Sequence, residues 1–300
     1  MLACASVLMV SVERAEDGRV SDIHLHAGGQ GFWVGRMAAR LGAAVTLVGP
    51  FGGEPGVVLR ALIEAEGLSV RSIETCRPNA VWISDDEEGE SATFAELDPP
   101  SLARHEADGL FNALLAAGLE SEVTVLTGGP PGVLDAERYQ GLAHDLHAVG
   151  GRVVADLSGG QLLAALDGGI DLVKVAHDEL VEAGLASGDG LEELLTGARE
   201  MRGRGAGGVL VSRADEPLLA DLDGRVVEVE TPAFQPVNHR GAGDSMTGAL
   251  AAALAAGDPV EAALRLAVAA GALNVTRRGL GSGDAEAIRR LAERVEVRAL

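Results

Sequence analysis

The sequence lacks several residues that define particular classes of protein. It has two cysteines, Cys4 and Cys76, which are too few for a disulfide framework or a zinc site. We therefore expect a reducing, cytoplasmic setting. Lysine occurs once, at Lys174, so a phosphate site must be built mainly from arginine, backbone N–H groups and metal. No apolar run approaches the ~20 residues of a membrane helix, so no membrane association is expected.

The start of the chain and its net charge exclude further classes. Residues Met1–Val12 are apolar but lack a basic leading region, so we interpret them as a buried first strand and not as a signal peptide. The net charge is −21 and the isoelectric point is about 4.6. Such a surface repels phosphate backbones, so nucleic acid is not an expected partner.

Short apolar strands alternate with amphipathic helices along much of the chain. This order is typical of an α/β fold with a mostly parallel sheet that helices cover on both faces. The predicted strands are Val45–Gly49, Val123–Thr127, Arg152–Asp156, Ile170–Val175 and Gly208–Ser212. The predicted helices are Glu54–Glu66, Asp135–Val149, Gly243–Ala256, Pro259–Thr276 and Asp284–Val295.

Three stretches depart from this alternation. Val20–His26 alternates apolar and polar residues, as a strand with one wet face does, and the acidic stretch Ala80–Leu97 is expected to be a hairpin. Together they predict a small second sheet, a lid with strands from about 8–27 and 75–98. A third hairpin is expected to turn at Asp223–Gly224. We expect one domain over residues 1–300, with this lid attached.

The most informative segment is Gly241-Ala242-Gly243-Asp244, which opens an alanine-rich helix. Small residues let the backbone turn tightly, and the free N–H groups of the helix start make an anion site. A carboxylate beside an anion site would repel a phosphate. It has a use when a hydroxyl must lose a proton as it attacks phosphorus. The alternative is that Asp244 only caps the helix.

This segment resembles the C-terminal signature of the ribokinase-like (PfkB) carbohydrate kinases, in which a GAGD turn opens a helix. The resemblance implies that Asp244 is the catalytic base and that the amides of Gly241, Ala242 and Gly243 hold the transferring phosphate. It also implies a ribokinase-like three-layer α/β/α sandwich with a small β lid. The family usually has Asp-Thr at the two positions that correspond to Asn238 and His239 here, just before the turn.

The segment from Gly28 to Gly35 resembles the family's N-terminal signature, GGKGxNVA, which contacts the substrate. The resemblance assigns substrate binding to Gly28, Gly29, Gln30 and Trp33, although Gln30 replaces the family lysine and Trp33 the family asparagine. Trp33 is either a core residue or a surface that stacks on a sugar. The family acid near the chain start has no clear counterpart, and Asp22 is the nearest candidate.

Three further stretches resemble motifs of the phosphosugar kinases in this family. The stretch around Arg77 implies binding of the substrate's own phosphate, with a solvated arginine as the alternative. The loop at Gly128 is expected to face the substrate from the carboxyl edge of the sheet. The stretch 156–180 resembles the 1-phosphofructokinase and tagatose-6-phosphate kinase branch. There Glu179 is expected to support Mg²⁺, although Ala176 replaces the family asparagine, and Lys174 is expected to reach a nucleotide phosphate or a carboxylate.

The nucleotide site is the least well defined by the resemblance. Ser212 and Arg213 lie where the family has a T-x-G-x-x-G nucleotide loop, but both glycines are absent. Arg213 is either a phosphate ligand or a surface arginine. Asn274 and Gly279 lie where the family lines its adenine pocket.

Together, these residues predict an ATP-dependent kinase that uses Mg²⁺ and phosphorylates a hydroxyl of a sugar or sugar phosphate. The resemblance also implies a homodimer. Two alternatives remain open: a kinase of a free sugar or nucleoside, and a regulatory protein that binds nucleotide or sugar with little turnover. A dehydrogenase is disfavoured because no glycine motif for a dinucleotide follows a first strand.

Overall fold

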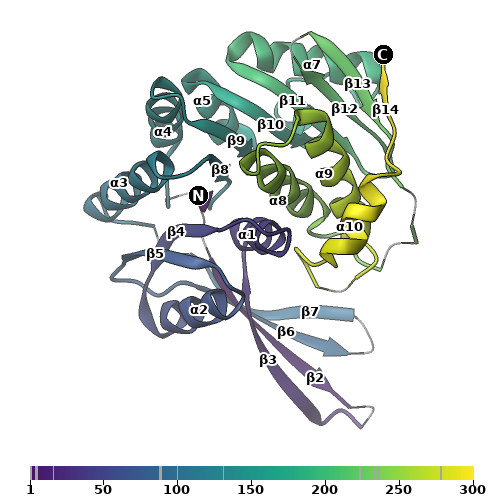
Figure 1. Ribbon diagram of the computed structural model, residues 1–300. Coiled ribbons are helices and arrows are strands. Elements are labelled where there is room, and N and C mark those ends of the chain that lie inside the picture. Colours follow the sequence, from purple (N-terminus) through teal and green to yellow (C-terminus); the bar gives the residue numbers. More distant parts are fainter. Residues whose placement is uncertain are drawn as a thin grey trace.

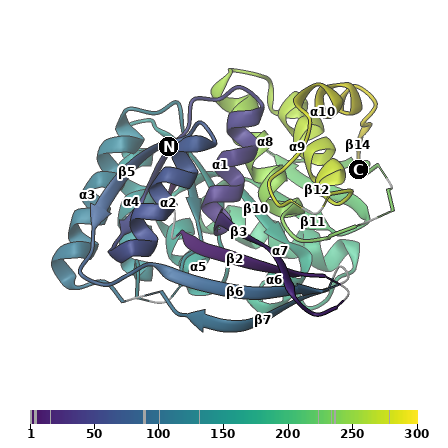
Figure 2. The same ribbon diagram turned by 90° about the horizontal axis from the view of Figure 1, so that it is seen from below.

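The computed structural model describes residues 2–3, 6–15, 17–87, 90–99, 101–130, 132–222, 224–232, 234–235, 237–277 and 279–300. Its strands form two sheets, one of ten strands and one of four. In Figure 1 the four-stranded sheet projects below the larger sheet and its helices. Seen from below, in Figure 2, its strands run across the molecule near the start of α1.

The large sheet is parallel over seven strands and antiparallel at one end. Its order is β14 (Val297–Ala299), β13 (Arg225–Val229), β12 (Glu216–Leu222), β11 (Ala206–Arg213), β10 (Ile170–Ala176), β9 (Arg152–Asp156), β8 (Val123–Thr127), β1 (Leu2–Ala3), β4 (Thr46–Phe51) and β5 (Ser69–Glu74). The strands from β11 to β5 are parallel, and β12, β13 and β14 are antiparallel. The strand order reverses at β1, and ligands of open α/β sheets bind at the carboxyl edge beside such a reversal.

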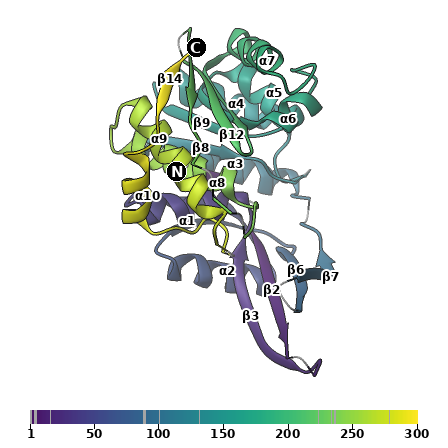
Figure 3. The same cartoon turned by 90° about the vertical axis from the view of Figure 1, so that its right-hand side faces the viewer.

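Helices cover both faces of this sheet, as the alternation of strands and helices predicts (Figure 3). One face carries α1 (Gln30–Arg40), α8 (Ala242–Ala255), α9 (Val260–Asn274) and α10 (Ala285–Ala292). The other carries α3 (Arg104–Leu119), α4 (Ala136–Ala148), α5 (Gly159–Gly168) and α7 (Leu191–Arg204). The short α6 (His177–Glu182) follows β10, and α2 (Gly53–Ala65) packs against β4, β5 and the small sheet.

Alternate residues of the central strands enter opposite cores. In β10, Val173 and Val175 pack with α4, α5 and α7, whereas Leu172 packs with the α8 side. Residues two apart in a strand share a face. Lys174 therefore points to the α8 side, and in β9 the same alternation directs Asp156 to that side as well.

The small sheet has the order β3 (Val20–Gly28), β2 (Val7–Arg14), β6 (Ala80–Glu87) and β7 (Glu90–Leu97). Its inner end packs on α2 through Leu8 and Ala27, which lie opposite each other in register. Farther along the same face, Ile23 and Leu25 are 53% and 45% exposed. This face of the small sheet is therefore apolar and largely uncovered in one chain.

The predicted strands and helices are confirmed to within three residues, with two corrections. The predicted first strand is two strands, because β1 enters the large sheet and β2 the small one; Met1 and Cys4 lie outside the described residues. Helix α10 ends at Ala292 and not at Val295, and β14 follows it, paired with β13. The predicted hairpin joins β12 to β13, but Asp223 of its turn lies outside the described residues. Among the described residues, no helix is long and apolar enough to cross a membrane.

Candidate active site

The turn Gly241–Asp244 is the start of α8, at the carboxyl edge of the parallel strands. Gly241 is the N-cap residue and has a left-handed backbone (φ 76°), which glycine adopts without steric cost. A side chain at 241 would also press on Leu280, since a Cβ there would lie 3.1 Å from the Leu280 Cβ. The N–H groups of Ala242, Gly243 and Asp244 belong to the first turn and have no carbonyl one turn earlier to bond. These groups form an anion site at the positive end of the helix.

Asp244 lies in this first turn and is partly buried. The pKa of its carboxyl is raised to about 7, chiefly by loss of solvent and also by the nearby carboxylates of Asp156 and Glu179, against the opposing effect of the Lys174 ammonium. A carboxyl with a pKa near 7 is half ionised at neutral pH. It can therefore accept a proton and release it again under the same conditions.

Lys174, the only lysine of the chain, lies directly beneath the turn. A Cβ built on Gly243 would lie 2.5 Å from its Nζ, so a larger residue at position 243 would displace the end of the lysine side chain. Nζ also lies 3.4 Å from Oδ1 of Asp156, its register partner on β9. Burial disfavours the charged amine, but Asp156, Glu179 and Asp244 outweigh it and raise the pKa of Lys174. The buried amine therefore stays charged under the anion site.

Thr247, one turn into α8, connects the helix to this ion pair. Its Oγ1 lies 2.6 Å from Oδ2 of Asp156 and 3.1 Å from the carbonyl oxygen of Gly243. A hydroxyl has one proton to donate. The carboxylate of Asp156 is closer and is the stronger acceptor, so the Thr247 hydroxyl donates to Asp156. Asp156 thus holds Lys174 with one oxygen and α8 with the other, which fixes the turn over the sheet.

Two glutamines hold the Gly128–Gly129 loop at the end of β8. Gln30, at the start of α1, accepts from the N–H of Gly128 (3.0 Å) and donates to the carbonyl of Asp156 (3.3 Å). Gln161, on α5, accepts from the N–H of Gly129 and donates to its carbonyl. The structure thus brings Gln30 and Gly128 together, as the predicted site requires, but the amide of Gln30 bonds the protein backbone.

The other predicted residues near the start of α1 have structural roles in close packing. Gly28 pairs with Val7, and a Cβ on it would lie 2.5 Å from the sulfur of Met9. Gly29 is the N-cap of α1 with a left-handed backbone (φ 105°). Trp33 is partly buried and packs against the core that α1, α2 and β4 share, in agreement with the core interpretation of this residue.

Glu179 lies at the start of α6, where its Oε2 accepts from the N–H of Ala176. This cap leaves Oε1 without a partner among the described residues. The same residues contain no group of three histidine, cysteine, aspartate or glutamate side chains that could hold a metal ion. A Mg²⁺ ion that keeps several waters needs only one or two carboxylates, so the donor set fits a hydrated ion bound mainly by phosphates.

Asp22 and Arg77 lie away from the turn. Asp22 is exposed on β3, six residues before Gly28, a separation of ~20 Å along a strand. The contact of Asp22 with the substrate therefore stays a prediction. Arg77 is exposed in the segment that joins β5 to β6, and its guanidinium has no partner among the described residues.

The predicted nucleotide contact of Arg213 is also not retained. Its guanidinium donates to the Pro217 carbonyl (2.7 Å), Glu216 (2.8 Å) and Glu228 (3.1 Å), and so ties three antiparallel strands together. Ser212 is partly buried and its hydroxyl lies 3.4 Å from the Val175 carbonyl. The next residue, Ala214, has a left-handed backbone (φ 52°), the conformation that glycine favours.

Asn274 is fully buried, so its predicted contact with adenine is not retained. Its Nδ2 donates to the carbonyl of Arg240 (2.9 Å) and its Oδ1 accepts from the N–H of Ser282 (3.4 Å). The side chain therefore joins the segment before the Gly241–Asp244 turn to the loop after α9. Gly279 is exposed in that loop, and its carbonyl accepts from the hydroxyl of Ser282.

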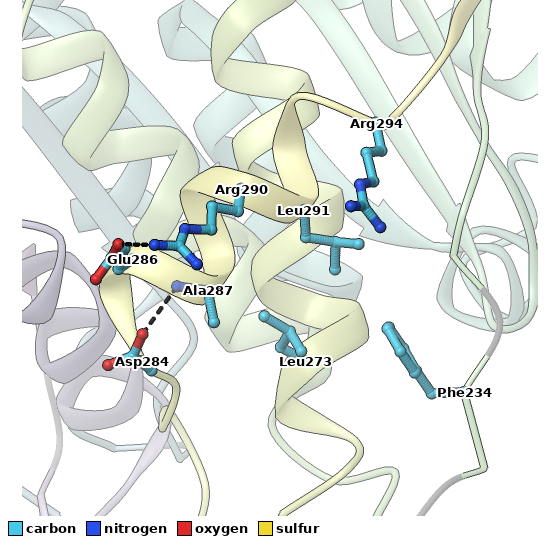
Figure 4. Close-up of a pocket in the computed structure, with 8 residues that line it drawn as sticks. All are labelled: Phe234, Leu273, Asp284, Glu286, Ala287, Arg290, Leu291 and Arg294. Atoms are coloured by element: carbon cyan, nitrogen blue, oxygen red, sulfur yellow. Dashed lines mark hydrogen bonds and ion pairs between the residues drawn. The ribbon is translucent and has the colours of Figure 1, made fainter.

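A cavity of about 340 Å³ lies beside this region, between α9, α10 and the segment that contains Phe234 (Figure 4). Its apolar wall includes Phe234, Leu273 and Leu291. Arg290 on its rim is paired with Glu286, whereas the guanidinium of Arg294 has no partner among the described residues.

Three residues of the site were not among the sequence predictions: Asp156, Thr247 and Gln161. Strand alternation and the parallel pairing of β9 with β10 would place Asp156 beside Lys174, and this signal is present in the sequence. The contacts of Thr247 and Gln161 depend on how two helices pack, which the sequence pattern does not define.

The fold and this geometry define a class of protein. An anion site, a buried ammonium beneath it and a carboxyl with a pKa near 7 lie together at the carboxyl edge of a parallel sheet, and these groups suit phosphoryl transfer to a hydroxyl. The chain matches the pfkB family of carbohydrate kinases over residues 2–287, and it belongs to that family. It is therefore a carbohydrate kinase, and the family implies ATP as the phosphoryl donor.

The relatives include phosphofructokinases over nearly the whole chain. The 1-phosphofructokinase of Vibrio cholerae is 28% identical over 298 residues, which cover 97% of this chain and 92% of the relative. The ATP-dependent 6-phosphofructokinase isozyme 2 of Escherichia coli is 32% identical over 264 residues, 84% of this chain and 82% of the relative.

The solved structures confirm the predicted fold. Phosphofructokinase-2 from Escherichia coli in complex with fructose-6-phosphate is 26% identical, with a TM-score of 0.82 over 98% of this chain and 99% of the other. Arabidopsis thaliana ribokinase complexed with ribose and ATP, 21% identical, has the same fold, with a TM-score of 0.75 over 97% of each chain.

Proposed function

We propose that this protein transfers the terminal phosphoryl group of ATP to a hydroxyl of a sugar phosphate, as 1-phosphofructokinases do. One observation supports this most strongly: Asp244, with a pKa of about 7, lies in the same helical turn as the free amides that can bind the phosphoryl group. A protein that only bound nucleotide would gain nothing from a partly buried carboxyl beside the phosphates.

In the proposed step, Asp244 takes the proton from the acceptor hydroxyl as its oxygen attacks the γ-phosphorus of ATP. The bond between γ-phosphorus and the β,γ-bridging oxygen breaks, and ADP leaves with the electron pair. Asp244 afterwards returns its proton to solvent. The phosphorylated sugar and ADP are the products, so charge and atoms balance without another reactant.

The turn amides and Lys174 stabilise the charge that develops during transfer. The amides of Ala242 and Gly243 lie at the positive end of α8, and Lys174 supplies a fixed positive charge directly beneath Gly243. Such preorganised groups are commonly the largest catalytic contribution, since they need not reorient during the step. We assign the predicted phosphate contact of Lys174 to this role.

Arg77 is the candidate for the acceptor's own phosphate. Its exposed guanidinium is not paired with a described residue, and arginine binds phosphate through two parallel hydrogen bonds. Gln30, where the family has lysine, positions the Gly128 loop. The acceptor site would therefore carry less positive charge than the family signature implies.

Mg²⁺ fits at Glu179, because Oε1 of Glu179 makes no hydrogen bond with a described residue. The ammonium of Lys174 also interacts electrostatically with this carboxylate. When bound there, the ion would neutralise charge on the nucleotide phosphates. Ala176 has no side-chain oxygen to add to this shell, so Glu179 would be the main contribution of α6.

We also propose that the four-stranded sheet is a lid and that two chains associate through it. A lid would exclude water, which competes with the acceptor hydroxyl. The exposed apolar residues Ile23, Leu25 and Leu97 would be covered in a homodimer.

The test is ADP release by the purified protein with Mg²⁺·ATP and a panel of acceptors: fructose 1-phosphate, fructose 6-phosphate, tagatose 6-phosphate, free fructose, ribose and a nucleoside. We expect a sugar phosphate to stimulate release above the rate without acceptor. Stimulation only by free sugars or the nucleoside would replace the proposed substrate class. ATP binding without stimulation by any acceptor would favour a regulatory protein.

A further inference from the structure

The fixed charges around the catalytic turn are predominantly negative. Asp156, Glu179 and Asp244 all act on the single ammonium of Lys174, which also lies 3.4 Å from Asp156. The terminal phosphates of a nucleotide add several negative charges to this group. A hydrated metal ion offsets part of them, but Coulomb repulsion at these distances favours a further cation close to the turn.

Arg240 is the residue directly before the N-cap glycine of the turn. It is exposed, and its guanidinium makes no hydrogen bond or ion pair with a described residue. By contrast, Arg213 lies where the family has its nucleotide loop, but its guanidinium donates to Glu216, Glu228 and the carbonyl of Pro217. Arg240 is therefore available for a ligand where Arg213 is not.

The backbone of Arg240 is held on both sides. Its N–H donates to Oδ1 of Asn238 (3.0 Å), and its carbonyl accepts from Nδ2 of the fully buried Asn274 (2.9 Å). The left-handed Gly241 follows immediately. The Cα of residue 240 therefore has a fixed position at the edge of the anion site, while its side chain remains free. A ligand need only order the side chain, which limits the entropy cost of binding.

We propose that Arg240 is a further phosphate-binding residue of this active site, and that its guanidinium binds the terminal phosphates of the nucleotide donor. This proposal rests on the proposed function. It explains the hydrogen bonds of Asn238 and Asn274, which hold the backbone of Arg240 beside the turn amides. The planar guanidinium can bond two oxygens of one phosphate, which an amine cannot do with the same geometry.

The experiment compares Arg240→Gln and Arg240→Lys with Arg225→Gln as a matched control. The side chain of Arg225 is also exposed without a partner among the described residues, but Arg225 begins β13, at the edge of the sheet opposite to the carboxyl ends of the parallel strands. Binding of ADP and of adenosine is measured by calorimetry, and KM for ATP is measured with saturating acceptor. Adenosine separates loss of phosphate contacts from damage to the whole site.

We expect Arg240→Gln to weaken ADP binding about 10- to 100-fold, as for a lost charge-assisted bond, with adenosine binding unchanged. Arg240→Lys should restore part of the affinity, and Arg225→Gln should match the wild type. Unchanged ADP affinity in Arg240→Gln would overturn the proposal, as would equal losses for ADP and adenosine. Failure of the wild type to bind ADP would instead overturn the proposed function and this proposal with it.

Discussion

Replacement of Asp244 by asparagine separates its chemical role from its cost to stability. The carboxyl has a pKa of about 7 in the folded protein and 3.8 as its ordinary value, chiefly because the site is shielded from solvent. Asparagine has nearly the same size but neither charges nor accepts a proton. We therefore expect phosphoryl transfer to fall by ~10²–10⁴-fold, the usual contribution of a general base.

The same change should stabilise the fold at high pH. A carboxyl whose folded pKa is raised costs free energy when it ionises: the cost is small near pH 4, grows with pH, and is complete above pH 7. The difference between a pKa of about 7 and the ordinary 3.8 corresponds to about 4 kcal/mol, and partial solvent access reduces this to roughly 2–4 kcal/mol. The advantage of Asp244→Asn should shrink as pH falls from 8 towards 5.5.

The assay is denaturant unfolding of wild type and variant across this pH range, with transfer activity measured on the same samples. Asp189→Asn, an exposed aspartate in the segment before α7, is the control and should show neither effect. The activity of the wild type should rise as pH passes through about 7, because the base must be ionised. A variant with wild-type stability at every pH and with activity within tenfold of wild type would refute the assignment of Asp244 as a shielded base.

Four further changes test the surroundings of the turn. Gly243→Ala would place a Cβ 2.5 Å from Nζ of Lys174, so we expect ~10²-fold lower kcat without loss of helical circular dichroism; a wild-type kcat would contradict this contact. Lys174→Met leaves Asp156 buried without its ammonium partner, and should lower the free energy of unfolding by about 3–5 kcal/mol in urea; a neutral result would refute the stabilising role of this ion pair. Ala214→Gly removes the strain of an alanine in the left-handed conformation and should raise the free energy of unfolding by about 0.5–1 kcal/mol in the same assay. A lower free energy of unfolding would show that the turn is unstrained. Arg77→Ala should raise KM for a sugar phosphate about 10- to 100-fold with KM for ATP unchanged, and equal changes in both would refute its assignment to the acceptor.

The catalytic turn could be predicted from the sequence because its geometry is local. Glycines at 241 and 243, an acid at 244 and the alanine-rich helix after them lie within a few residues of one another, so their arrangement follows from one helix start. The parallel part of the large sheet was predictable for the same reason, since β4, β8, β9 and β10 are each followed by a helix.

The network beneath the turn is non-local and was only partly predictable. Lys174 was recognised, but its partner Asp156 depends on the register of two parallel strands. Arg213 lies at the expected position in the sequence, but its guanidinium is neutralised by Glu228. Glu228 lies on β13, which is two strands from β11 in the sheet. Asn274 is buried by packing of α9 against neighbouring loops, which its side-chain type does not reveal. The three-residue β14 depends on β13 as its partner and is too short to carry a pattern of its own.

The central claim is that Asp244 promotes phosphoryl transfer from ATP to a sugar phosphate. The most direct measurement is ³¹P nuclear magnetic resonance of wild type and Asp244→Asn incubated with Mg²⁺·ATP and either fructose 1-phosphate or fructose 6-phosphate. We predict that the wild type converts one of these into a bisphosphate with an equal amount of ADP, and that the variant forms neither product at a comparable rate. A wild type that binds ATP but phosphorylates neither sugar phosphate, or a variant that forms the bisphosphate as fast as the wild type, would contradict the claim.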